Sequence, residues 1–127
     1  LPARLFSDPG RPPILVTCAR TAARYDPDDD RQHVMVAGDD AVDVSRALAM
    51  LREQGMRRIL CEGGPTLLDE LVEADAVTEI CVTLAPKLAA SQPVGHRLHP
   101  ARLPAPVTMS LEHALVCDGY LFLRYCR

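Results

Sequence analysis

The strongest constraint that this sequence places on its fold is the alternation of short apolar runs with helical segments. Continuous runs of β-branched and other apolar residues predict strands, and apolar residues spaced three and four apart predict helices. The predicted strands are 13–18, 33–37, 58–62 and 78–85, and the predicted helices are 44–54 and 65–74. Strands that alternate with helices favour a parallel sheet with helices on its faces.

The carboxy-terminal part of the sequence predicts an antiparallel hairpin. Two extended runs, 107–117 and 120–125, flank the dipeptide Asp118-Gly119. Asp-Gly between two apolar runs is a strong signal for a two-residue hairpin turn. The predicted fold is therefore α/β, with a mixed, mostly parallel sheet, flanking helices and a C-terminal antiparallel hairpin.

Composition excludes several classes of function. With 127 residues, the chain can form one domain around one hydrophobic core. A formal charge of −3 gives no attraction to nucleic acid or to an anionic membrane, and no apolar run approaches the roughly 20 residues of a membrane span. The five cysteines show no C-x-x-C spacing, which predicts reduced thiols, mostly buried on strands, in a cytoplasmic protein. His96 and His99 lack a third ligand, so we predict no metal site.

The segment Glu62-Gly63-Gly64-Pro65-Thr66 is the clearest functional candidate, because it joins a predicted strand to a predicted helix. The first amides of a helix lack internal partners and attract anions, and glycine lets a phosphate approach the backbone. A tight turn without a ligand produces the same pattern. Neither G-x-G-x-x-G nor the P-loop motif is present, which argues against a standard Rossmann site or a P-loop.

Three stretches, 59–68, 77–80 and 84–88, together resemble the signature of the RibD carboxy-terminal reductase family. In that family a hydrophobic strand leads into E-G-G-P-x-L, a helix and a strand that ends in A-P, and the fold is similar to that of dihydrofolate reductase. The resemblance implies NADPH as cofactor. The residues that it places at the cofactor are Gly63, Gly64 and Thr66 at the pyrophosphate, Thr17 and Arg20 at the adenosine 2′-phosphate, and Ala37 and Gly38 at the adenine.

The reaction that the resemblance implies is reduction of the ribosyl group of a ribosylaminopyrimidine 5′-phosphate to ribityl, as by a 5-amino-6-(5-phosphoribosylamino)uracil reductase. Glu62 is the candidate catalytic residue at the nicotinamide or substrate end, although a solvent-facing Glu at a strand end is the simpler reading. The proton donor is either Glu62 or water. Two alternatives stay open: a related reductase of a pterin or folate, and a non-catalytic nucleotide-binding domain of the same fold.

The chain opens with Leu1 rather than Met and reads as if it began within a domain. We expect residues 1–127 to form the carboxy-terminal portion of a single reductase domain whose amino-terminal part is missing. No zinc-deaminase motif is present in this sequence. The expected partners are a phosphorylated pyrimidine and a second copy of the chain, with neither nucleic acid nor membrane.

Overall fold

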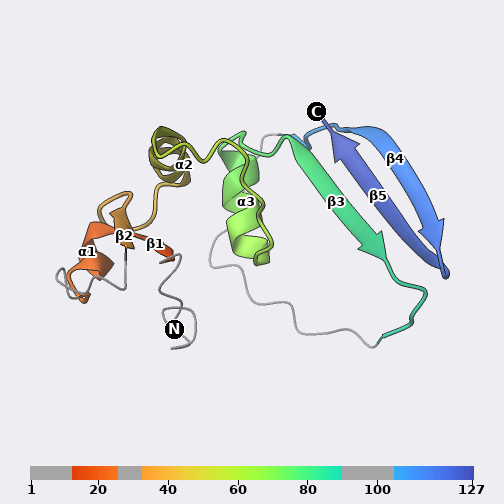
Figure 1. Cartoon of the computed structure of the whole chain (residues 1–127), viewed down its shortest axis with the longest axis horizontal. Coiled ribbons are helices and arrows are strands. Elements are labelled where there is room, and N and C mark those ends of the chain that lie inside the picture. Colours follow the sequence, from red (N-terminus) through yellow and green to blue (C-terminus); the bar gives the residue numbers. More distant parts are fainter. Residues whose placement is uncertain (1–12, 26–32, 90–104) are drawn as a thin grey trace. The chain divides into compact units, whose positions relative to one another are not determined.

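The computed structural model describes residues 13–25, 33–89 and 105–127. The chain divides into two units, Leu1–Glu62 and Gly63–Arg127, and each is described by itself. Helices and strands occur in both, so the fold is mixed α/β (Figure 1). No helix among the described residues is long and apolar enough to cross a membrane.

The first unit contains a pair of parallel strands, β1 (Ile14–Thr17) and β2 (His33–Val36), in the predicted parallel arrangement. A short helix, α1 (Ala19–Ala22), follows β1, and α2 (Val44–Glu53) follows β2. All of the described buried residues belong to this unit: Thr17, Cys18, Met35, Ala37 and Ala47. The small core therefore lies where β1 and β2 end and their helices begin.

Helix α2 begins and ends where its sequence signals predict. The Asp43 carboxylate accepts a hydrogen bond from the Arg46 amide at 2.9 Å, which caps the first turn. After the helix, Gly55 adopts φ +86°, a left-handed conformation that glycine enters without a steric penalty. These contacts are local in the sequence, which is why the pattern predicts them well.

The second unit contains α3 (Pro65–Glu73) and a three-stranded antiparallel sheet in the order β3-β5-β4. The strands are β3 (Glu79–Leu84), β4 (Ser110–Cys117) and β5 (Tyr120–Cys126). Asp118 and Gly119 connect β4 to β5 with φ values of 50° and 78°, as a type I′ turn requires. The predicted hairpin is confirmed.

One face of this sheet carries only apolar and aromatic side chains. Strand register and the alternation of side chains place on it Ile80, Val82, Leu84, Leu111, Ala114, Val116, Leu121, Leu123 and Tyr125. No described residue of the second unit is buried. The apolar face is therefore largely uncovered within the described part of this unit.

The predicted strand 58–62 is wrong. The segment is irregular and exposed, with Ile59 at 46% and Leu60 at 83% of full exposure. An apolar run becomes a strand only where a neighbour takes up its backbone hydrogen bonds, and no described strand pairs with this segment. Without it, the described strands form one parallel and two antiparallel pairings, so the expected predominance of parallel pairing is not observed.

Two expectations about burial also fail. Of the five cysteines, all of them free, only Cys18 is buried, and Cys61, Cys81 and Cys117 are exposed. The apolar stripe of α3 is only partly covered: Leu67 and Leu68 are exposed. Both errors have the same cause, because the periodicity of a segment shows which side chains need cover but not whether cover is present.

Candidate functional site

The turn that precedes α3 is open. Gly64 is the N-cap of the helix, Pro65 fills the first helical position, and no side chain caps the free amides. A Cβ built on Gly63 or Gly64 would meet no atom of the described residues within 4 Å. Thr66 is exposed in the first turn. This helix start therefore has backbone donors without a capping side chain, the type of group that attracts anions, and anion binding here stays a prediction.

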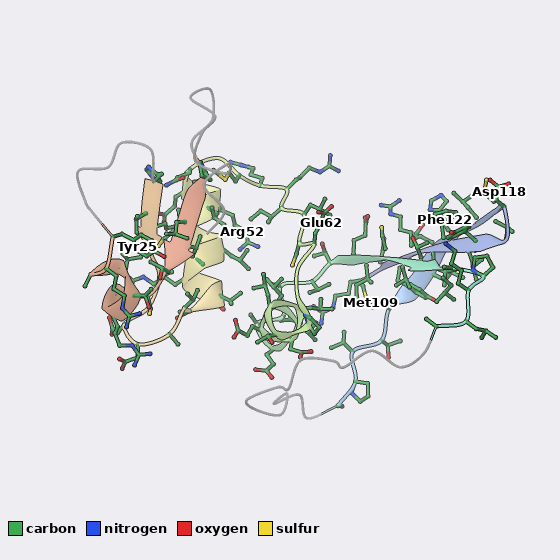
Figure 2. All side chains as sticks on the ribbon, turned by 90° about the horizontal axis from the view of Figure 1, so that it is seen from below. Tyr25, Arg52, Glu62, Met109, Asp118 and Phe122 are labelled. Atoms are coloured by element: carbon green, nitrogen blue, oxygen red, sulfur yellow. The ribbon has the colours of Figure 1, made fainter. Side chains whose placement is uncertain are left out.

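Glu62 lies in the irregular segment just before this turn (Figure 2). Its side chain is exposed. The strand that was expected to hold it in apolar surroundings does not form. Glu62 therefore precedes the open glycines in the chain and is not buried, and its catalytic role stays a prediction.

The four candidate residues of the first unit gather at the carboxyl ends of β1 and β2. Thr17 ends β1 and is only 6% exposed, and its carbonyl accepts a hydrogen bond from the Ala37 amide at 2.8 Å. Ala37 is fully buried, directly after β2. Burial leaves both side chains little surface for a ligand. Of these four residues, Arg20 offers the most accessible polar group.

Gly38 has a structural reason to be glycine. It adopts φ +103°, and a Cβ there would lie 2.2 Å from the Ala41 carbonyl oxygen. The turn then continues to Asp43, whose amide donates to the Ala37 carbonyl at 2.9 Å. The glycine that was expected to flank adenine is thus required by the chain itself.

The loop after β2 supplies hydrogen-bond acceptors to α1. The Ala19 amide donates to the Gly38 carbonyl at 2.9 Å, and the Arg20 amide donates to the Asp39 carbonyl at 3.0 Å. These two helix-start amides are therefore occupied and unavailable to an anion. Nη2 of Arg20 donates a hydrogen bond to the Asp40 carbonyl at 3.0 Å. Nη1 of Arg20 lies 3.9 Å from the Asp40 carboxylate.

Cys18 joins the same two segments. Its Sγ donates to the Asp40 carbonyl at 3.2 Å and lies 3.4 Å from Thr21 Oγ1. Hydrogen bonds with the Thr21 side chain and backbone lower the pKa of the Cys18 thiol, and the Arg20 charge lowers it too. Burial raises this pKa but has a smaller effect than the hydrogen bonds. The sequence did not reveal the contacts of Cys18 and Arg20 with Asp40, because they join the start of α1 to the loop after β2 across twenty or more positions.

The candidate residues thus form two groups. Thr17, Arg20, Ala37 and Gly38 belong to the first unit, and Gly63, Gly64 and Thr66 belong to the second. Glu62 is the last residue of the first unit. Within the described residues no cluster of three or more metal-ligating side chains occurs, and His96 and His99 lie outside that part of the chain.

Comparison with known proteins decides the family. The family model of the RibD C-terminal domain matches residues 1–103. This chain belongs to the RibD C-terminal domain family. A curated relative from Archaeoglobus fulgidus, a 2,5-diamino-6-ribosylamino-4(3H)-pyrimidinone 5′-phosphate reductase, is 31% identical over 129 residues. That alignment covers 100% of this RibD C-terminal chain and 49% of the relative, so the chain spans about half the length of the curated relative that it matches.

Proposed function

We propose that the protein is an NADPH-dependent reductase of riboflavin biosynthesis that converts the ribosyl group of a ribosylaminopyrimidine 5′-phosphate to ribityl. The observation that carries the proposal is the open Gly63-Gly64 turn at the start of α3, in a chain similar over its whole length to a named pyrimidine reductase. The family match supports the same reaction class.

In each unit, the candidate residues have the chemistry that one part of a dinucleotide requires. In the described part of the chain, Gly63 and Gly64 have no neighbouring atom where a Cβ would stand, which leaves room for a diphosphate to reach the backbone amides. Thr66 adds a hydroxyl in the first turn of α3. The exposed Arg20 guanidinium suits the 2′-phosphate that distinguishes NADPH from NADH. Thr17, Ala37 and Gly38 are proposed to mark the adenosine end by their place beside Arg20 at the ends of β1 and β2. Because the Thr17 and Ala37 side chains are buried, Arg20 supplies the polar side-chain contact.

When bound, NADPH supplies the hydride that reduces C1 of the ribose in its open, imine-like form. The carbon–nitrogen double bond becomes single, and the nitrogen takes up a proton. We assign Glu62 to hold that proton or to orient the water that delivers it, because its exposed carboxylate directly precedes the open glycines. The backbone at 63–66 binds and orients the diphosphate.

We further propose a cytoplasmic homodimer that binds neither nucleic acid nor membrane. The uncovered apolar face of β3, β4 and β5 supports contact with a second copy, because exposed apolar patches of this kind favour association. The formal charge of −3 supports the absence of a nucleic-acid partner. Light scattering of the full-length protein tests the dimer, and a monomer at micromolar concentration would contradict it.

The enzymatic proposal is tested with the full-length protein, NADPH and two substrates, the 2,5-diaminopyrimidinone and the 5-aminouracil ribosylamino 5′-phosphates. We expect loss of NADPH absorbance and a ribityl product by mass spectrometry. Glu62→Gln should lower kcat by roughly a hundredfold or more, as for loss of a general acid, while the NADPH Kd changes less than about twofold. Oxidation of NADPH only with a dihydropterin or dihydrofolate would support the folate-type alternative. NADPH binding without oxidation by any of these compounds would support a non-catalytic domain.

A further inference from the structure

The carboxyl ends of β1 and β2 bring an exposed cation and an exposed carboxylate together. Arg20 Nη2 donates to the backbone carbonyl of Asp40 at 3.0 Å. Arg20 Nη1 lies 3.9 Å from the Asp40 carboxylate, which is too long for a hydrogen bond. The backbone therefore positions the guanidinium, and the Asp40 side chain acts on it mainly through its charge.

Both side chains are open to solvent, at 71% exposure for Arg20 and 88% for Asp40. A guanidinium has five N–H donors, and the Asp40 carbonyl occupies one of them. An exposed ion pair of this length is weak, so it does not hold the two side chains away from a ligand. Each group is therefore free to act on whatever binds at this edge.

The two groups act in opposite directions on the two nicotinamide dinucleotides. Arginine pairs with a phosphate, whereas a carboxylate repels a phosphate and accepts a hydrogen bond from a hydroxyl. In Rossmann folds, a different class of dinucleotide-binding site, an acidic residue recognises the ribose 2′-hydroxyl of NAD, and an arginine accommodates the 2′-phosphate of NADP by the same chemistry. This chain carries both types of residue within one contact.

We infer that Asp40 is a specificity-determining residue that opposes Arg20. Arg20 favours a 2′-phosphorylated adenosine, and the Asp40 carboxylate weakens that preference and retains affinity for the 2′-hydroxyl form. The native protein then discriminates between NADPH and NADH less sharply than Arg20 alone would dictate. This inference rests on the proposed function, because it requires a dinucleotide at the ends of β1 and β2.

One substitution removes the negative charge of Asp40 without changing the backbone contact of Arg20. Asp40→Asn keeps the backbone carbonyl that positions Arg20, so the guanidinium stays in place. Asp39→Asn is the matched control, because Asp39 is the adjacent exposed residue with a carboxylate. Within the described residues, the Arg20 side chain pairs with the side chain of Asp40 and not with that of Asp39. A general change in net charge affects both variants equally, whereas a specific effect appears only at Asp40.

The experiment measures binding of 2′,5′-ADP, 5′-AMP, NADPH and NADH to the full-length protein by calorimetry. Asp40→Asn should strengthen binding of 2′,5′-ADP and NADPH by about threefold to tenfold, which is the range that Coulomb's law in water gives for one neighbouring charge with salt screening. Binding of 5′-AMP and NADH should stay constant or weaken. The gain in affinity of Asp40→Asn should shrink at high salt. Asp39→Asn should change the affinities less than about twofold. Arg20→Gln should abolish the preference for 2′,5′-ADP over 5′-AMP.

Two results overturn the inference while leaving the proposed function intact. One is dinucleotide binding with an unchanged ratio of NADPH to NADH affinity in Asp40→Asn. The other is an equal gain in Asp40→Asn and Asp39→Asn, which would reveal a general charge effect. Absence of dinucleotide binding in the native protein and in every variant would instead refute the proposed function, and this inference with it.

Discussion

Gly63→Ala separates a ligand-binding role of the turn before α3 from a structural one. Within residues 13–25, 33–89 and 105–127, a Cβ at Gly63 would meet no atom within 4 Å, and Gly63 is not among the glycines with positive φ. The protein itself therefore has room for the methyl group, and the free energy of unfolding should change by less than about 1 kcal/mol. A phosphate oxygen that binds a backbone amide lies about 2.9 Å from the nitrogen, so a methyl on the adjacent Cα intrudes on the ligand.

We expect Gly63→Ala to weaken NADPH binding at least tenfold, or about 1.4 kcal/mol. Calorimetric titration gives the Kd, and urea denaturation of the same protein gives the stability. Gly55→Ala is the matched control, because Gly55 is assigned no contact with the ligand. Its φ of +86° is left-handed, so alanine there should cost about 1 to 2 kcal/mol of stability and leave the Kd unchanged. An NADPH affinity within twofold of the native value in Gly63→Ala would refute the reasoning about this turn.

Three further changes test the fold. Asp43→Ala removes the cap on the Arg46 amide and should lower the free energy of unfolding by about 1 kcal/mol in urea denaturation. Gly119→Ala should cost about 1 to 2 kcal/mol in the same assay, because φ is +78° and the new Cβ would lie 3.3 Å from Pro86 Cγ. The hydrogen bond from Arg124 at 2.6 Å lowers the pKa of Glu79. A lowered folded-state pKa stabilises the protein above the ordinary Glu value, and this contribution is lost as the pH falls through the lowered pKa. Between about pH 6 and pH 3, Arg124→Gln should therefore flatten the dependence of the urea midpoint on pH, and an unchanged slope would contradict the pairing.

Local signals explain which parts of the fold could be predicted from the sequence. The cap of α2 at Asp43 and the turn at Asp118-Gly119 depend on residues only a few positions apart. A short stretch of sequence therefore contains all the residues that determine each of these two features. The parallel pairing of β1 with β2 was predicted less directly, from the alternation of strands and helices.

Features that depend on distant partners were missed. The run 58–62 has the composition of a buried strand, but a strand also needs a neighbour to accept and donate its ladder hydrogen bonds. Arg20 and Asp40 are twenty positions apart, and only the pairing of β1 with β2 brings them into contact. Composition identifies such residues as polar or apolar, and the tertiary structure decides what they touch.

Glycines in this chain illustrate why a residue type alone does not identify a ligand site. Gly38 was assigned to the cofactor from the sequence, yet the Ala41 carbonyl at its Cβ position accounts for it completely. Gly64 has a partial internal reason, because glycine is tolerated at an N-cap far better than alanine. Among the described residues, Gly63 has neither a close neighbour nor a left-handed conformation that demands glycine. If binding measurements reveal a requirement for glycine at this position, a bound molecule explains it better than the described contacts of the chain do.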